Sequence, residues 1–298
     1  MATYAGLYGL LALALNLVWG MAGMINLGLV GFFAFGAYVS ALASLKIGLP
    51  MAGALAAAVV FTAAVGAVMA LTTARLRGDY LAIITLGFSE VVRLVASNEI
   101  WLTRGTDGIS GIPGPWRGRV TPEAFNLIYL LLVVITLLGA LWVMERIRRS
   151  PYGRVLRALR DDDQVVAVAG KRVIAYKIQA FAVSAGLLGL AGGLYGHYTS
   201  YIAPDAFVPL VTIYVVLALT AGGTGSNWGA VLGACLVVFF LESARFLTAW
   251  LPGLSPVQVA AVRELVIGAS LILVLRWRPQ GLVPERVPRM SLAAGETS

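Results

Sequence analysis

The densest group of charged side chains lies between residues 150 and 177, SPYGRVLRALRDDDQVVAVAGKRVIAYK, which holds six Lys or Arg and three Asp. Within this charged segment, three arginines and an aspartate recur at spacings of three and four residues: Arg154, Arg157, Arg160 and Asp161. That spacing predicts a helix with one charged face, and Gly170 is typical of the residue that ends a helix. Guanidinium and carboxylate groups form charge-assisted hydrogen bonds with a partner protein. A solvated loop is the alternative, and composition alone favours it.

Two further acid–base pairs lie inside apolar runs. Glu90 and Arg93 stand three residues apart in ITLGFSEVVRL, and Glu242 and Arg245 do so in FLESARF. Ionisable groups within a membrane span are costly and are functional candidates by default. A partner at i+3 equally permits a purely structural pair. Glu90 lies in the middle of its run, so we favour it over Glu242 as a functional residue.

The glycine-rich stretch AGGTGSNWG, residues 221–229, resembles a turn that exposes backbone N–H groups to a phosphate. It lacks the Gly-Lys-Ser/Thr of a nucleotide-binding loop, and no Lys follows residue 177. We therefore expect no ATP site on this chain. We interpret the stretch as a tight re-entry or a close helix contact between two spans.

His197 is the single histidine of the chain. It lies beside Tyr195, Tyr198 and Tyr201 at the expected outer end of a span, which is typical of an interfacial aromatic belt. The sequence therefore predicts a boundary residue rather than a proton relay. Cys235 is the single cysteine and can form no internal disulfide.

These side chains belong to a chain that is 59% hydrophobic and 12% charged. Soluble domains carry about 25% charged residues, so the composition predicts a polytopic membrane protein. The net charge of +8 is concentrated near 75–77, in 145–177 and near 276–289. Basic residues in short loops between apolar runs mark the cytoplasmic side of a membrane protein. We interpret the charge as a topology signal and expect no nucleic-acid partner.

Nine apolar runs approach the length of about 20 residues that a helix needs to cross a membrane. They lie near 5–20, 27–45, 51–74, 79–97, 126–146, 176–199, 207–224, 226–250 and 258–276. The first two are separated by GMAGMINLG, which predicts a tight turn or a broken, partly re-entrant segment. We therefore expect an all-α polytopic fold with about eight or nine transmembrane helices. The first 45 residues contain no Lys or Arg, so we expect a retained membrane segment rather than a signal peptide.

The loops predict a topology for a single transmembrane domain, residues 1–298. The basic loop 147–176 is expected on the cytoplasmic side, and the charge-balanced loop 98–125 on the opposite, periplasmic side. The basic tail 277–298 then returns to the cytoplasm. The periplasmic loop contains TDGISGIPG, residues 106–114, whose glycines and proline predict a shaped turn rather than a random linker.

Several stretches resemble the permease subunits of branched-chain amino acid ABC importers, the LivM-like family. The similarity is carried by GRVLRALRDDDQVVAVAG, YKIQAFAVSAGLLGLAGGLYGHY, LNLVWGMAGMINLGLVGFFAFGAYVSAL, GDYLAIITLGFSEVVRL, TDGISGIPG, GGTGSNWGAVLGA and RWRPQGL, which span roughly residues 10–282. The Glu-Ala-Ala signature of importers corresponds here to Gln164, Val165 and Val166, which is a departure. A second histidine that the family often carries is Leu29 here, which argues against a histidine-based proton path.

The resemblance implies an ABC importer permease fold in which the charged segment forms a short cytoplasmic coupling helix, seated in a groove of an ATPase subunit. The residues expected to make this contact are Arg157, Arg160, Asp161, Asp162, Asp163, Gln164 and Gly170. Those expected to dock a periplasmic substrate-binding protein are Asp107, Gly108, Ser110, Gly111 and Pro113, unless turn geometry alone explains their loop. Candidates for the pathway or its gating are Asn26, Glu90, Gly222 and Gly223.

The implied protein is a non-enzymatic subunit in the bacterial inner membrane that helps to import branched-chain or related neutral amino acids. Its expected partners are membrane lipid, a second homologous permease, two ATPase subunits that bind ATP and Mg, and a periplasmic substrate-binding protein. No cofactor is expected on this chain. One alternative is a permease for urea, amides or another small neutral solute. Another is a stand-alone secondary transporter, which would carry its own coupling residues.

Overall fold

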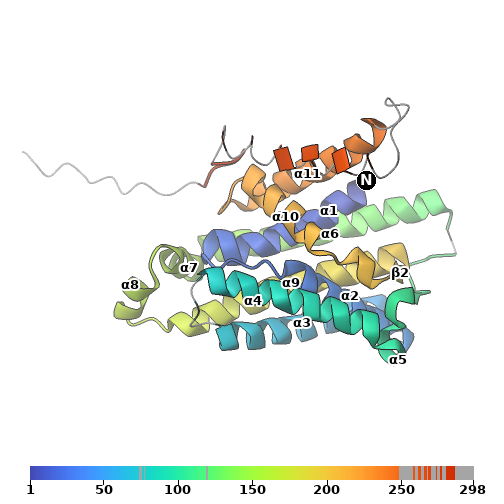
Figure 1. Ribbon diagram of the computed structural model, residues 1–298, viewed down its shortest axis with the longest axis horizontal. Coiled ribbons are helices and arrows are strands. Elements are labelled where there is room, and N and C mark those ends of the chain that lie inside the picture. The colour runs from blue at the N-terminus through green and yellow to red at the C-terminus, as the bar shows by residue number, and fades with distance from the viewer. Residues whose placement is uncertain are drawn as a thin grey trace, which may run out of the picture.

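The computed structural model describes residues 1–73, 76, 78–118 and 120–247, together with 258, 261–262, 265–266, 268–269, 273, 276 and 280–285. This part of the chain forms a bundle of helices that run roughly along one common axis (Figure 1). The predicted all-α class is confirmed there, apart from two short strands, β1 (Ile109–Ser110) and β2 (Tyr201–Ile202). These strands pair antiparallel, with Ile109 opposite Ile202.

Six helical segments among the described residues are long and apolar enough to cross a membrane. They are α1 (Ala2–Leu15) with the π-helical turn Asn16–Met21 that continues it, α3 (Met51–Thr73), α4 (Gly78–Asn98), α6 (Pro122–Arg149), α9 (Val173–Thr199), and Pro204–Gly222, which contains α10 (Pro209–Gly222). Two shorter apolar segments, α2 (Leu29–Leu45) and Asn227–Glu242 within α11 (Asn227–Leu247), fall on two further predicted spans. The ninth predicted run, 258–276, lies almost entirely outside the described residues, so the total of eight or nine stays a prediction.

The chain is not helical between the π-helical turn and α2, which confirms the predicted interruption at GMAGMINLG. The backbone N–H of Leu27 donates to Thr85 Oγ1 on α4 (3.1 Å), and that of Gly28 donates to Asn26 Oδ1 (3.0 Å). A Cβ at position 28 would lie 2.0 Å from the carbonyl oxygen of Thr85. Only glycine permits this close approach, so Gly28 fixes where the broken segment, residues 22–28, meets α4.

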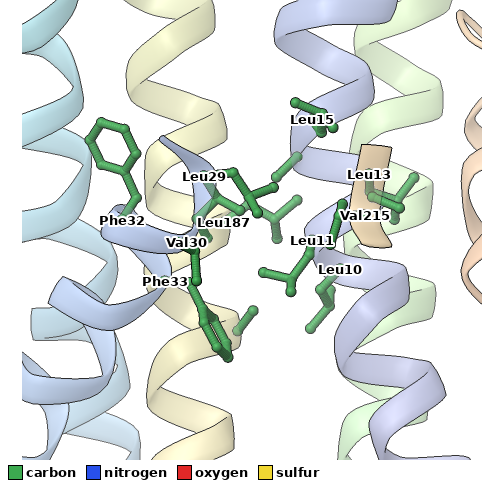
Figure 2. Packing of buried hydrophobic residues seen from close by; sticks show 14 of the residues in the cluster. Leu10, Leu11, Leu13, Leu15, Leu29, Val30, Phe32, Phe33, Leu187 and Val215 are labelled. Carbon is green, nitrogen blue, oxygen red and sulfur yellow. The ribbon is translucent and has the colours of Figure 1, made fainter. Parts of the chain in front are cut away.

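The core lies where α1, α2 and α9 meet. Helices α2 and α3 pack along α9, while α1 packs against α6, α9 and α11. Figure 2 shows Leu11 of α1 turned toward Leu29 of α2 and Leu187 of α9. Small residues bring the backbones together, since a Cβ at Gly192 would lie 2.0 Å from the carbonyl oxygen of Phe33. Membrane helices associate through such close packing because lipid tails are as apolar as leucine.

The charged segment and the loop 98–125 lie at opposite ends of the bundle (Figure 1). Helices α7 (Pro151–Asp161) and α8 (Asp163–Val168) stand at one end, and α5 (Ile100–Thr103) stands at the other beside β2. This arrangement agrees with the predicted topology. The side of the membrane that each end faces stays a prediction.

Candidate functional site

The charged segment contains two helices rather than the single helix that the sequence predicted. Asp162 adopts an extended conformation, with φ −160° and ψ 117°, and separates α7 from α8. Its carboxylate accepts hydrogen bonds from the backbone N–H groups of Gln164 (2.8 Å) and Val165 (3.4 Å). An aspartate in this position satisfies the free N–H groups of a new helix. The prediction of one continuous helix was wrong, because Asp162 ends α7 and caps the start of a second helix, α8. Gly170, with φ +76°, lies in the turn that follows α8.

Helix α7 lies against the bundle through its apolar face. Ser150 begins it, because its hydroxyl accepts a hydrogen bond from the N–H of Gly153 (3.2 Å), and Leu156 and Leu159 are buried. Tyr152 stacks on Tyr176 of α9, with 5.4 Å between ring centroids. Burial raises the pKa of Tyr152 to about 12, so this phenol stays neutral and acts as an anchor.

Helix α8 presents apolar side chains to solvent. Val166 is buried, whereas Val165 is 63% and Val168 is 90% exposed. The three consecutive aspartates, Asp161–Asp163, are exposed beside them. A mixed apolar and acidic tip of this kind is a suitable contact surface for another protein, because apolar area supplies binding energy and charges supply orientation.

The two arginines expected to contact an ATPase differ in their surroundings. Nη1 of Arg160 donates to the carbonyl oxygen of Gly20 (2.6 Å) and to Oε2 of Glu285 (2.8 Å). The side chains of Arg160 and Glu285 are 28% and 14% exposed. Arg157 makes no hydrogen bond or ion pair with the described part of the chain. Arg160 therefore makes internal contacts that the sequence did not indicate, and its contact with an ATPase stays a prediction.

The tail residues 280–285 lie against the glycine-rich turn between α10 and α11. The N–H groups of Leu282 and Val283 donate to the carbonyl oxygens of Ala221 and Gly222, both at 2.9 Å. A Cβ at Gly222 would lie 1.9 Å from the carbonyl oxygen of Gly229, and Gly223 has φ +118°. The interpretation as a close helix contact is confirmed. A role of Gly222 and Gly223 in gating stays a prediction.

A polar network at the same end was not found by sequence reasoning. The buried Asn16 donates from Nδ2 to Asn227 Oδ1 (2.9 Å) and accepts from the N–H of Gly225 at Oδ1 (2.8 Å). Asn227 Nδ2 in turn donates to Glu145 Oε2 (3.2 Å), which also accepts from Arg148 Nε (2.8 Å). These residues come from three separate stretches of the chain, so no sequence pattern indicates that they meet.

A cavity of about 540 Å³ lies between the charged segment and the broken segment 22–28. Its polar wall comes from α7, α8 and α9: Arg160, Asp161, Asp162, Asp163, Gln164 and Lys177. Lys177 Nζ lies 3.2 Å from Asp163 Oδ2. Five of the seven residues predicted to couple to an ATPase therefore line one cavity, whereas Arg157 and Gly170 are not among its lining residues. Gly170 follows the end of α8.

The loop at the opposite end is a shaped turn, as predicted. The N–H of Gly111 donates to Ser200 O (3.0 Å), and the hydroxyl of Tyr201 donates to Asp107 O (3.0 Å). Four of the predicted docking residues are exposed: Asp107, Ser110, Gly111 and Pro113. Gly108 is buried with φ +72°, so it serves the turn and is not available for contact. Docking by the other four stays a prediction.

His197 is buried, so its predicted place in an interfacial belt is wrong. Nδ1 lies 2.6 Å from the carbonyl oxygen of Pro113, and Nε2 lies 2.9 Å from Ser40 Oγ. Because a carbonyl oxygen can only accept, Nδ1 carries the proton, and the neutral ring accepts from the Ser40 hydroxyl at Nε2. The histidine thus ties the loop 106–114 to α2 and α9.

The predicted pairing of Glu90 with Arg93 is confirmed. Arg93 Nε lies 3.0 Å from Glu90 Oε2, and Nη2 lies 2.5 Å from Oε1. The side chains are 40% and 26% exposed. Asn26 is buried, and its Oδ1 accepts from Gly28 within the broken segment. The side chain of Arg245 lies outside the described part of the structure, so its pairing with Glu242 stays a prediction.

No group of three or more His, Cys, Asp or Glu side chains among the described residues could hold a metal ion. The polar residues described above at the two ends of the apolar helix bundle instead form exposed surfaces and hydrogen-bonded contacts.

Comparison with known proteins places this arrangement among transport proteins. A family described as "Branched-chain amino acid transport system / permease component" matches residues 1–275. The high-affinity branched-chain amino acid transport system permease protein LivM of Salmonella typhimurium is 34% identical, over 99% of this chain and 72% of that protein. The probable permease protein LivM of Methanocaldococcus jannaschii is 29% identical, over 94% and 91%. The permease protein LivH of Escherichia coli is 26% identical, over 94% and 92%. No solved structure matches the chain.

Proposed function

The chain belongs to the family of branched-chain amino acid transport permease components, and from this membership we propose that it is the membrane permease subunit of an ATP-driven importer. The transported solutes are leucine, isoleucine, valine or closely related neutral amino acids. The chain lacks the Gly-Lys-Ser/Thr of a nucleotide-binding loop, so ATP hydrolysis is assigned to separate ATPase subunits.

The observation that carries this proposal is the pair of helices α7 and α8 at one end of the bundle. Their tip offers exposed Val165 and Val168 beside Asp161–Asp163. Exposed apolar side chains of this kind are stabilised when another protein covers them. An ATPase subunit is the partner that an importer requires at its cytoplasmic side. We assign α7 and α8 as the coupling element, with Arg157 as the guanidinium free to contact the ATPase.

Motion of this element has a direct route into the membrane part. Arg160 joins the end of α7 to Gly20 in the π-helical turn and to Glu285 of the tail. A Cβ at Gly23 would lie 2.9 Å from the Cα of Arg160, so α7 touches the broken segment itself. A displacement of α7 by an ATPase would therefore reach the first span and the tail together.

The second permease is proposed from the relatives. Both LivM and LivH, two permease proteins of branched-chain amino acid transport systems in Escherichia coli, are similar to this chain along most of its length. Two homologous chains of this kind would form a pseudo-symmetric pair with the solute path at their interface. A transport-active assembly that contains this chain and no second permease would contradict the pairing.

Reconstitution tests the function. The chain is purified with its second permease and ATPase subunits, placed in proteoliposomes, and supplied with the substrate-binding protein and labelled leucine. We expect uptake that requires both ATP inside and binding protein outside. The control is the same assembly with a hydrolysis-deficient ATPase. Uptake that continues in this control, or that follows an ion gradient, would indicate a secondary transporter instead.

A further inference from the structure

Helix α4 carries an ion pair near the middle of a membrane span. Glu90 lies two residues beyond the helix midpoint at Phe88 and Arg93 lies five beyond it, which is about 3 Å and 8 Å along the axis at 1.5 Å per residue. The hydrocarbon core of a membrane is about 30 Å thick, so both groups fall inside it when α4 spans the membrane. Both side chains are partly exposed on the surface of the bundle.

Other exposed positions at this depth are apolar. On α3, Val60 and Phe61 are exposed beside the helix midpoint, and α6 exposes Leu131 and Ile135. These faces suit lipid. Charged side chains at such a depth face a bundle interior or a water-filled path instead, because hydrocarbon does not solvate them. The exposed face of α4 therefore borders something other than lipid.

The exposed side chains next to the pair on α4 are aliphatic and leave room. Gly87 stands one turn before Glu90 and Val91, and nothing in the structure lies within 4 Å of the Cβ that it lacks. Ile83, Val91 and Leu94 are exposed around it. The opposite face of α4 is occupied, since Thr85 and Ser89 are buried there. The exposed face thus combines the Arg93 guanidinium, the Glu90 carboxylate, the open space over Gly87 and branched aliphatic side chains.

We propose that this face of α4 contacts the transported solute, a zwitterionic amino acid with an aliphatic side chain. Arg93 receives the α-carboxylate, Glu90 receives the α-ammonium group, and the aliphatic side chain lies over Gly87 against Ile83 and Leu94. This assignment rests on the proposed function and adds the residues that recognise the solute in the membrane.

The charges account for selectivity. In the absence of solute the two groups neutralise each other, and Arg93 Nη1 makes no hydrogen bond with the described part of the chain. The carboxylate and ammonium of an α-amino acid are joined through one carbon, so they can engage both members of a contacting pair at once. A bound zwitterion adds no net charge to the pair, and neither group is left unpaired in an apolar setting, which is the costly alternative.

The first test replaces both charges in the complete, reconstituted importer. Glu90→Met together with Arg93→Met removes the pair while keeping side-chain length. We expect membrane abundance and binding of the ATPase subunits to be retained, and leucine uptake to fall at least tenfold. A pair that serves only structure, or that faces lipid, predicts uptake close to wild type in this variant. That result would overturn the proposal.

The second test asks whether water reaches this face, and uses the single cysteine of the chain. In a Cys235→Ser background, Val91→Cys on α4 is compared with Val60→Cys on α3, positions that are 57% and 65% exposed near the middle of their helices. A charged, membrane-impermeant thiol reagent is expected to modify only the α4 cysteine in the assembled importer, and leucine is expected to slow the reaction. Equal lack of modification at both positions would mean that lipid or another chain covers α4, against the proposal.

The two proposals fail in different ways. An assembly of wild-type chains that imports no branched-chain amino acid contradicts the proposed function. An assembly that imports leucine, yet is unaffected by loss of the Glu90–Arg93 pair, contradicts only the solute contact on α4.

Discussion

Replacing Arg160 with glutamine separates the internal role of this residue from contact with an ATPase. The variant loses the hydrogen bonds to Gly20 O and to Glu285 and leaves a largely buried carboxylate without its partner. Hydrogen bonds to charged groups contribute about 1.5–3 kcal/mol each. Partial exposure of Arg160 reduces the benefit of the ion pair, so we expect a total loss of about 3 kcal/mol, which is roughly a hundredfold in an equilibrium constant.

Hydrogen exchange of the tail measures this loss. The N–H groups of Leu282 and Val283 are held by the carbonyl oxygens of Ala221 and Gly222, and Glu285 helps to hold the tail in place. When Arg160→Gln releases Glu285, these amides open more often, and we expect their exchange in the purified complex to rise by up to about a hundredfold. The melting temperature of the complex should fall as well.

The matched control is Arg157→Gln, which removes a guanidinium from the same helix without breaking a hydrogen bond or ion pair among the described residues. We expect unchanged exchange at 282–283 and weaker association with the ATPase subunits. Glu285→Gln completes a double-mutant cycle with Arg160→Gln. Additive effects in this cycle, or unaltered exchange in Arg160→Gln, would refute the tie between α7 and the tail.

Three further outcomes are expected. Val168→Asp, at the 90% exposed tip of α8, should leave the melting temperature unchanged and reduce ATPase co-purification at least tenfold; full co-purification would exclude α8 from the interface. His197→Ala removes the ring contacts to Pro113 of the loop 106–114 and to Ser40 of α2 and should cost about 2–4 kcal/mol. We expect faster protease cleavage within 106–114; unchanged cleavage would contradict the tie between this loop and α2. Gly222→Ala should lower the amount of folded chain in the membrane, whereas Gly139→Ala, which meets nothing within 4 Å, should not; equal yields would contradict the close contact between α10 and α11.

Much of the fold could be predicted from short stretches of the sequence. Apolar runs of about 20 residues satisfy their backbone groups within one helix in a membrane, so hydropathy alone located α1, α3, α4, α6 and α9. The interruption at 20–28 and the turn at 106–114 were also predicted, because glycine changes the conformations open to its own stretch of backbone. Similarly, Arg93 is one helical turn from Glu90, so their pairing follows from spacing alone.

The capping of α8 shows where local reasoning stopped. The spacing of Arg154, Arg157, Arg160 and Asp161 predicted one helix with a charged face, which ends at Gly170. Which of three adjacent aspartates leaves the helix depends on how α7 and α8 lie against the bundle. That placement buries Val166 and exposes Val168. Because both residues are valines with the same hydrophobicity, residue type alone does not predict which of them is buried.

The sequence by itself determined that this is a polytopic helical membrane protein with one charged segment between spans, because hydropathy and charge act over one helix or one loop. Only the tertiary structure decided that Arg160 meets Glu285, that Asn16 meets Asn227 and that His197 meets Pro113. These partners are 125, 211 and 84 residues apart. A polar side chain next to a membrane interior must find a partner, but the sequence around it does not say which one, since the partner is chosen by how the helices pack.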